Sequence, residues 1–421
     1  MSYQKLSDGI DFICQETNKF KTTLLSVHFY TPITQENAAV NAILPYLLIG
    51  GAPDYPDYAS VNAQLNMLYG AELSCKTRLL GDIRQTSIQL AFINDQYADS
   101  PISDDAVKFL HHIVFGRFER GYGFLEKEIS REKRLLCQQI ESLKNEKRAY
   151  ARQKATELLF WGEPAGIFRY GDIKSVEALT ADDIQNAYNI LLKTARVRIT
   201  VVGSTLPTDL SERMSAAFNA VGRDFCPLPE NIVTPYGELK TVVERMPVIQ
   251  GKTVLGFTTE HGGDDSETLP LYVMTDLLGG GPYSRLFLNV REKQSLCYYC
   301  AANAFRAKGA LLVDSGIEPD NAERVQKAVL AEVEALAKGD FTDQQLETCR
   351  RALCDALQAL KDDQVACEGF LSSRFRRLEE PDIDNFTHLV SKVTAQQVRD
   401  AAAELRLSTV YTLLPEEGEA K

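Results

Sequence analysis

FLEKEISREKRLLCQQIESL, residues 124–143, aligns without a gap on FTDQQLETCRRALCDALQAL, residues 341–360. Identical residues recur at a constant offset of 351 − 134 = 217: Phe124/Phe341, Arg134/Arg351, Leu136/Leu353, Cys137/Cys354 and Leu143/Leu360. Internal similarity of this length decides the architecture before any single motif does. The chain is therefore expected to contain two copies of one domain.

Further segments match in the same order along the chain. Leu179–Ile184 corresponds to Val393–Val398 at an offset of 394 − 180 = 214, and each segment has a threonine in the N-cap position of a helix. At an offset of 298 − 69 = 229, three more residues correspond: Gly50 with Gly279, Gly51 with Gly280, and Tyr69 with Tyr298. Because the order never changes, the drifting offset indicates loop insertions and deletions between two homologous copies.

The pattern within each copy predicts the fold class. Each copy shows a strand, two helices, two strands, long helices and a final strand, without regular alternation of strand and helix. This order favours an α+β fold in which a sheet packs against helices. We expect one domain over residues 1–221, a connection with the first strand of the second copy over 222–252, and a second domain over 253–421.

The composition and net charge of the chain argue against several classes of function. The chain has 421 residues and a formal charge of 46 − 58 = −12, which argues against nucleic acid as a partner. Its cysteines number nine, are scattered, and suit reduced thiols in a reducing compartment. The first residues lack the pattern of a secretory signal, and the most apolar stretch, residues 38–51, is too short to span a bilayer. These features predict a cytoplasmic protein.

The sequence does not predict a metal site. None of the five histidines has a partner at the spacing of H-x-x-E-H or H-E-x-x-H, and the adjacent His111 and His112 diverge on a predicted helix. Cys297 and Cys300 form a lone CxxC pair. On a regular strand, residues three apart point to opposite faces, so both cysteines are interpreted as packing residues.

Two features of the second copy could contact a peptide. Gly279, Gly280 and Gly281 form a turn between predicted helices, and they lack the Gly-Lys-Ser/Thr ending of a phosphate loop. Arg291 is expected near a helix end and Tyr298 at the start of the next strand. A guanidinium and a phenol that converge there would donate hydrogen bonds to a peptide carbonyl, although an arginine at a helix end more often serves a structural role.

The segment GGGPYSRLFLNVREKQSLCYY, residues 279–299, followed by KGALLV, residues 308–313, resembles the second domain of the pitrilysin/insulinase family of zinc peptidases. The resemblance covers essentially the whole chain. It implies duplicated α/β roll domains arranged as one half of a clamshell. It also implies that Arg291 and Tyr298 bind the substrate carbonyl and that the glycines line the opening to the cleft.

The first copy departs from this family at the metal. Alignment on the turn at residues 48–52 places Ala42, Pro45 and Tyr46 where active members carry the two histidines and the general base of H-x-x-E-H. The distal carboxylate ligand falls on Gln139. Ala42, Pro45, Tyr46 and Gln139 neither hold Zn²⁺ nor activate water, so the chain resembles a non-catalytic family member.

The resemblance implies a substrate-binding subunit that pairs with a homologous zinc-bearing chain to cleave peptides, as in mitochondrial processing peptidase and paired bacterial proteins. No cofactor is expected in this chain, and zinc is expected only in the partner. In isolation the chain could form a homodimer. The alternatives are a structural scaffold of the same fold without proteolysis and, less favoured, a stand-alone metallopeptidase with unorthodox ligands.

Overall fold

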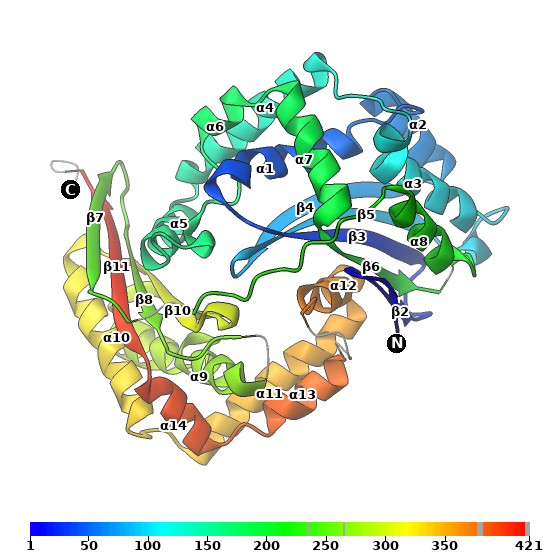
Figure 1. Cartoon of the computed structure of the whole chain (residues 1–421). Helices are drawn as coiled ribbons and strands as arrows, with labels where there is room; N and C mark the ends of the chain where they lie inside the picture. Colours follow the sequence, from blue (N-terminus) through cyan, green and yellow to red (C-terminus); the bar gives the residue numbers. More distant parts are fainter. Residues whose placement is uncertain (205, 234–235, 264–265, 377–381, 417–421) are drawn as a thin grey trace. The chain divides into compact units, whose positions relative to one another are not determined.

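The computed structural model describes residues 1–421 except 205, 234–235, 264–265, 377–381 and 417–421. The chain forms two compact units (Figure 1). Unit 1 comprises Met1–Ile140, Ile167–Glu230 and Leu360–Asp382, and unit 2 comprises Glu141–Gly166, Asn231–Ala359 and Ile383–Lys421. Each unit contains one sheet packed with helices, which confirms the predicted α+β class.

The sheet of unit 1 has the strand order β1-β2-β6-β3-β5-β4. Its strands are β1 (Ser2–Ser7), β2 (Ile10–Glu16), β3 (Thr22–Pro32), β4 (Glu72–Leu80), β5 (Ile83–Ile93) and β6 (Arg196–Gly203). Its helices are α1 (Gln35–Ile49), α2 (Tyr58–Met67), α3 (Ser103–Glu119), α4 (Glu126–Ser142, ending at the unit boundary), α6 (Ile173–Ala178), α7 (Ala181–Thr194), α8 (Leu210–Ala220) and α12 (Gln364–Ser373).

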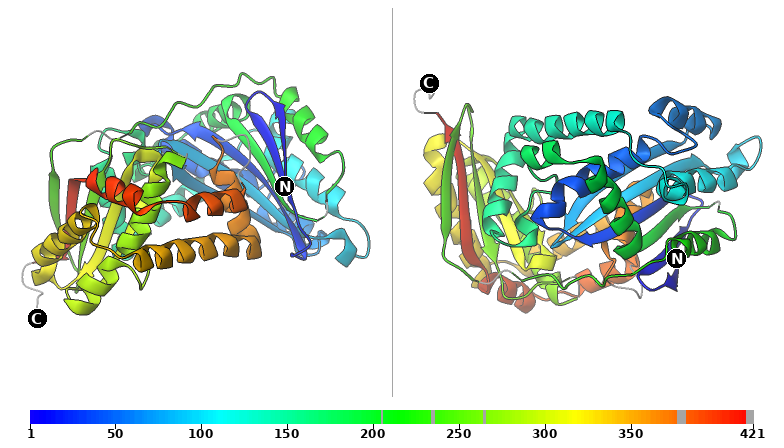
Figure 2. Two further views of the ribbon diagram at one scale, coloured as in Figure 1. Left: turned by 90° about the horizontal axis from the view of Figure 1, so that it is seen from below. Right: turned by 45° about the horizontal axis from the view of Figure 1, so that its top comes forward.

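Alternation along β3 separates the two faces of this sheet. Leu25, Val27 and Phe29 point into the apolar core, which α1, α3 and α7 complete on one face (Figures 1 and 2). The intervening His28 and Tyr30 point to the opposite face, where α12 packs on β3 and β6. The period of two thus yields one apolar and one polar face, both buried.

Polar contacts hold α12 on this face. Glu368 Oε1 lies 2.5 Å from His28 Nε2, and both side chains are buried. Gln89 Nε2 donates to the other Glu368 oxygen at 2.9 Å, and Arg198 Nη1 donates to the Leu371 carbonyl at 3.0 Å. The helix therefore satisfies hydrogen-bonding groups that the strands bury.

The sheet of unit 2 has the order β7-β11-β8-β10-β9. Its strands are β7 (Lys240–Met246), β8 (Gly251–Thr258), β9 (Cys297–Phe305), β10 (Ala310–Ile317) and β11 (Arg406–Pro415). Its helices are α5 (Lys147–Leu159), α9 (Leu269–Gly279), the π-helix η5 (Leu286–Lys293), α10 (Ala322–Ala337), α11 (Asp343–Ala359), α13 (Ile383–Ser391) and α14 (Ala395–Ala403). β7, from the predicted connection, runs parallel to β11 at the edge of the sheet.

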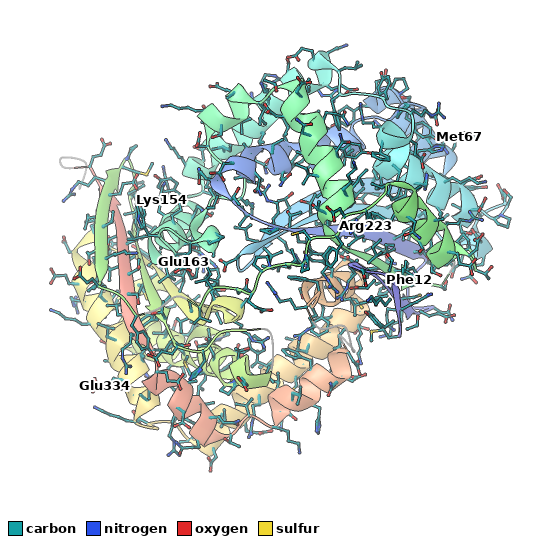
Figure 3. All side chains as sticks on the ribbon, in the orientation of Figure 1. Phe12, Met67, Lys154, Glu163, Arg223 and Glu334 are labelled. Carbon is teal, nitrogen blue, oxygen red and sulfur yellow. The ribbon has the colours of Figure 1, made fainter. Side chains whose placement is uncertain are left out.

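One face of this second sheet is covered by α5. Tyr150, Ala151 and Ala155 of α5 pack with apolar residues of β8, β10 and β11. Arg148 Nε lies 2.6 Å from the buried carboxylate of Asp314 on β10. Figure 3 labels Lys154 on this helix and Glu163 just beyond its end.

The compact units do not coincide with the sequence copies, because each copy contributes one helix to the unit formed mainly by the other copy. α5 begins at Lys147 and α12 at Gln364, and 364 − 147 = 217 is the offset of the repeat itself. These equivalent helices are exchanged, because α5 of the first copy belongs to unit 2 and α12 of the second copy belongs to unit 1. Each sheet is thus completed by the other copy.

Replacing Glu368 by alanine is expected to lower the free energy of unfolding by about 3–5 kcal/mol, because His28 then stays buried without its partner carboxylate. The matched control is Asp362→Ala, which removes the exposed Lys19–Asp362 pair at 2.7 Å and is expected to cost about 0–1 kcal/mol. Urea denaturation followed by circular dichroism measures both. Equal losses would contradict a supporting role for the buried pair.

The Glu368 contribution should also depend on pH. Burial alone would raise the pKa of this carboxyl, but His28, Arg78 and Gln89 outweigh burial and lower the pKa from its usual 4.5. A lowered folded-state pKa gives stabilisation that is complete above the unfolded-state pKa and is lost as the pH falls through the folded-state pKa. The stability difference between the wild-type chain and Glu368→Ala should shrink on acidification below pH 4.5. A growing difference would refute this origin.

Candidate functional site

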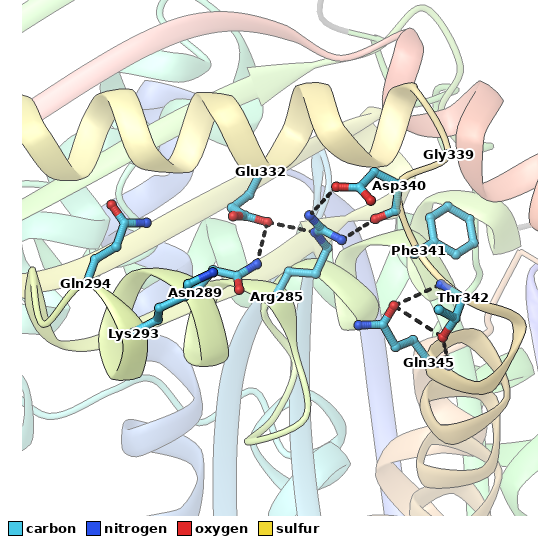
Figure 4. A pocket seen from close by; sticks show the side chains of 10 residues that line it. All are labelled: Arg285, Asn289, Lys293, Gln294, Glu332, Gly339, Asp340, Phe341, Thr342 and Gln345. Carbon is cyan, nitrogen blue, oxygen red and sulfur yellow. Dashed lines mark hydrogen bonds and ion pairs between the residues drawn. The ribbon is translucent and has the colours of Figure 1, made fainter.

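Arg291 lies near the end of η5, and a neighbouring arginine fixes that helix in place. Arg285 Nε donates to Glu332 Oε2 on α10 at 2.7 Å, and Asn289 Nδ2 donates to the same oxygen at 3.0 Å (Figure 4). Arg285 is 8% exposed, so this anchor is shielded from water. The helix that carries Arg291 is therefore held to α10.

The anchor lines a polar hollow of about 680 Å³ within unit 2 (Figure 4). The lining residues are Arg285, Asn289, Lys293, Gln294, Glu332, Gly339, Asp340, Phe341, Thr342 and Gln345. Arg285 is already paired with Glu332 and also donates to the Asp340 carbonyl. Because Arg285 already has these partners, we assign the residues around this hollow a structural role, which is to hold η5 in place.

Among the residues that the structure describes, the Arg291 guanidinium makes only weak contacts. Its carbon lies 4.6 Å from the centre of the Phe287 ring, and Nε lies 3.6 Å from Glu292 Oε1. The side chain is 40% exposed. Exposed pairs of this kind contribute little, so the guanidinium remains available to donate hydrogen bonds to a ligand.

A short turn connects Arg291 to Tyr298. Ser295 has a φ of 50°, and the Leu296 amide donates to the Val290 carbonyl at 3.1 Å, which reverses the chain into β9. Tyr298 is 47% exposed and its hydroxyl donates to the Glu318 carboxylate. The positive charge of Arg291 acts on the Cys297 thiol, next to Tyr298. The predicted guanidinium and phenol thus lie at one end of β9.

The pairing of β9 with β10 contains a bulge at Tyr298. Cys297 is opposite Ile317 and Tyr299 is opposite Gly316, so Tyr298 has no partner on β10. The interpretation that Cys297 and Cys300 point to opposite faces is therefore wrong. The extra residue shifts the alternation, and the two thiols contact each other through a hydrogen bond. The sequence carries no signal for this bulge.

The glycine run divides into a buried and an exposed part. Gly279 is buried at the end of α9, where an added Cβ would lie 2.6 Å from the Ala302 amide nitrogen. Its role is therefore close packing of α9 on β9. Gly280 is exposed and Gly281 is half-buried, and the Tyr283 hydroxyl donates to Asp276 Oδ2 at 2.7 Å across this turn. Only Gly280 and Gly281 can face a ligand.

The four positions of the missing zinc motif lie on α1 and α4 of unit 1. Ala42 and Pro45 are buried in α1, and Tyr46 follows one residue later. Gln139 on α4 hydrogen-bonds Tyr46, and its Nε2 also donates to the Tyr170 hydroxyl at 2.9 Å. Burial raises the pKa of the Tyr46 hydroxyl to about 12. The structure thus brings Tyr46 and Gln139 together.

The residues at these positions do not fit a zinc ion. A catalytic zinc site takes imidazole, carboxylate or thiolate donors, and here the corresponding side chains are a methyl, a proline ring, a phenol and an amide. Across the ranges that the structure describes, no group of three or more His, Cys, Asp or Glu side chains could hold a metal ion. His111 instead contacts Glu119 at 2.8 Å, and His112 lies 3.5 Å from Asp54.

Known proteins have sequences and structures similar to those of this chain. A family model described as "Peptidase M16 inactive domain" matches residues 178–353. The Bacillus subtilis protein "Probable inactive metalloprotease YmfF" is 27% identical over 405 residues, covering 96% of this chain and 95% of that protein. The chain is similar to inactive members of the M16 peptidase family. This confirms the resemblance to the pitrilysin/insulinase peptidases.

Solved structures have the same fold as this chain. A conserved protein from Enterococcus faecalis matches with a TM-score of 0.88 and 24% identity, covering 99% of this chain and 98% of that chain. A peptidase M16 inactive domain from Pseudomonas fluorescens matches with a TM-score of 0.78 and 17% identity, covering 100% and 99%. Among the described residues, no helix is both long and apolar enough to cross a membrane.

Sequence reasoning missed Tyr170, which accepts a hydrogen bond from Gln139 and is the third member of the cluster with Tyr46. It follows Gln139 by 170 − 139 = 31 residues, beyond any helical or strand spacing. Tyr170 is 7% exposed and packs edge-on against Phe168 with ring centres 5.3 Å apart. Only tertiary structure reveals that a tyrosine, an amide and a second tyrosine occupy this region.

Rebuilding the motif should restore metal binding. The combined change Ala42→His, Pro45→Glu, Tyr46→His and Gln139→Glu is expected to bind one zinc per chain after dialysis, because it supplies three ligands and a base at positions that already meet. The wild-type chain should hold a small fraction of that amount by elemental analysis. The variant that keeps Gln139 is the control and should bind zinc weakly. No zinc in the complete variant would overturn the assignment of these positions.

Proposed function

We propose that this chain is the substrate-binding, non-catalytic subunit of a heterodimeric M16 peptidase. The observation that carries the proposal is an asymmetry between its copies. The second copy keeps Arg291 and Tyr298 at one end of β9, whereas the first copy has no metal donor at the zinc-motif positions. A chain with the binding residues and without the metal donors would bind the peptide, and a partner chain would cleave it.

Arg291 and Tyr298 would donate hydrogen bonds to a peptide carbonyl. A guanidinium and a phenol both stabilise negative charge that develops on a carbonyl oxygen. Their present partners are acidic groups at the surface, Glu292 and Glu318. A bound carbonyl can therefore replace these contacts at small cost, because exposed pairs contribute little.

The peptide would lie as an added strand along β9. β9 is the last strand of its sheet, so one of its edges is unpaired within the sheet. Main-chain hydrogen bonds to such an edge supply affinity without requiring a particular sequence. Tyr298 at the start of the strand, the exposed Gly280 and the half-buried Gly281 would then flank the peptide.

The partner would be a homologous chain that carries H-x-x-E-H and binds zinc. In this arrangement the partner supplies the metal and the attacking water, and this chain supplies no cofactor. We place the complex in the cytoplasm, because all nine cysteines are free thiols. In isolation the chain is proposed to form a homodimer through the surface that otherwise meets the partner.

Arg291→Ala, assayed in complex with a zinc-bearing M16 chain, is expected to lower kcat/KM by the equivalent of about 2–4 kcal/mol, because a donor to the developing oxyanion is lost. The matched control is Arg324→Ala, which removes another exposed arginine of unit 2 and should leave kcat/KM within about twofold. Cleavage of a fluorogenic peptide measures both.

Three outcomes separate the alternatives. Unchanged turnover by Arg291→Ala would reject the proposed role of this residue. A zinc-bearing chain that is fully active alone, with no gain on mixing, would favour a structural scaffold. Stoichiometric zinc with peptide cleavage by the wild-type chain alone would favour a stand-alone peptidase.

A further inference from the structure

The bulge at Tyr298 brings two cysteines of β9 to one face of the sheet. Cys297 is opposite Ile317 and Cys300 is opposite Ser315, and these two residues of β10 are two positions apart. Residues two apart on a strand share a face. Both thiols therefore point toward the face on which α9 packs, where Gly279 approaches Ala302.

The same register brings the two backbones within reach of a disulfide. Two residues of β10 span about 6.6 Å, so the Cα atoms of Cys297 and Cys300 are separated by about that distance instead of the roughly 10 Å of an unbulged strand. Disulfides usually join Cα atoms about 4.4–6.8 Å apart. The pair lies at the upper end of this range, so bond formation must shorten the segment that contains Tyr298.

The two thiols have different surroundings. Cys297 is half-buried, whereas Cys300 is 7% exposed and lies 3.5 Å from Ser315 Oγ. The hydrogen bond with Cys300 lowers the pKa of Cys297 despite its partial burial, and the Arg291 charge lowers it further. That hydrogen bond and burial raise the pKa of Cys300. An accessible, acidified thiol beside a buried one is the arrangement of an attacking and a resolving cysteine.

We propose that Cys297 and Cys300 form a reversible redox site whose oxidation to a disulfide re-aims Tyr298. The effect on Tyr298 rests on the proposed function, which assigns Tyr298 to peptide binding. The formation of the disulfide does not depend on the proposed function.

The oxidant is a low-molecular-weight disulfide. The Cys297 thiolate attacks one sulfur of R–S–S–R, forming a mixed disulfide and releasing R–S⁻. Cys300 then loses its proton and attacks the Cys297 sulfur, which forms the protein disulfide and releases the second R–S⁻. The two protein thiols lose two electrons and two protons, and R–S–S–R becomes two R–SH. A thiol reductant reverses the reaction.

The first experiment treats the full chain with oxidised glutathione and then alkylates the remaining thiols. Trypsin cuts after Lys293 and Arg306, so both cysteines fall in one peptide, residues 294–306, that contains no other cysteine. We expect this peptide to lose two hydrogens and to resist alkylation until dithiothreitol is added. Recovery of both cysteines in alkylated form would overturn the redox site.

Two single variants test the assigned order of attack. Cys300→Ser should accumulate a mixed disulfide of glutathione on Cys297, because the resolving thiol is missing. Cys226→Ser removes an exposed cysteine elsewhere and is the matched control, which should leave the disulfide of residues 294–306 unchanged. Stronger glutathionylation of Cys226 than of Cys297 would overturn the order, since exposure alone would then determine reactivity.

The second experiment measures binding of fluorescein-labelled casein, an unfolded polypeptide, by fluorescence anisotropy. Oxidation should weaken binding to the wild-type chain by about fivefold, the size expected when one interface anchor is displaced. The double variant Cys297→Ser with Cys300→Ser should not respond to the oxidant. A disulfide that forms without changing affinity, while Arg291→Ala weakens binding, would refute the link to Tyr298 and leave the proposed function intact. If neither change alters binding, the proposed function fails while the redox site stands.

Discussion

The exchange of α5 and α12 is the constraint on which both units depend. The first copy buries polar side chains such as His28, Gln89 and Arg198 on one face of its sheet, and α12 of the second copy supplies their partners. A buried group of this kind that is left without its partner costs about 1–3 kcal/mol. The second sheet depends on α5 in the same way through Asp314. Neither copy forms a complete unit by itself, and the duplication is therefore fixed as a pair.

The positions that the sequence alignment assigns to the zinc motif lie in parts of unit 1 that packing and hydrogen bonds stabilise. Ala42 and Pro45 lie within the apolar core of unit 1, which is stabilised by packing and needs no metal. Pro45 stands inside α1, where a proline removes a backbone donor and costs about 3 kcal/mol in an isolated helix. Such a residue is tolerated because the surrounding core holds the helix, and the sequence alignment predicts that its position corresponds to the general base of active members. Hydrogen bonds of Gln139 join α4 to α1 through Tyr46 and to the segment before α6 through Tyr170.

Much of the fold was predictable because local chemistry and tertiary structure agree. Thr180 and Thr394 both form capping boxes at the start of a helix. As expected, each of these helices is followed by a strand, which is the last strand along the chain in its sheet. The absence of H-x-x-E-H from the first copy is read directly from the sequence, since the motif specifies donors at fixed spacing. The exchange of helices was not predictable, because α5 and α12 have the same sequence pattern whichever sheet they cover. The face of Cys297 was not predictable either, since a bulge inserts one residue without any marker in the sequence.

The bulge is a difference between the two copies. The edge hairpin of unit 1, β4 with β5, pairs in register from Glu72 to Leu80 without a shift, whereas β9 with β10 is shifted at Tyr298. The shared fold therefore does not require a bulge at the edge strand. A bulge sacrifices regular pairing and typically redirects one side chain. In this chain the redirected side chain is Tyr298, which lies at the start of β9, just after the turn that follows Arg291. The bulge therefore falls on the residue that the binding hypothesis needs. Tyr298 is exposed, so the bulge does not fall on a core position.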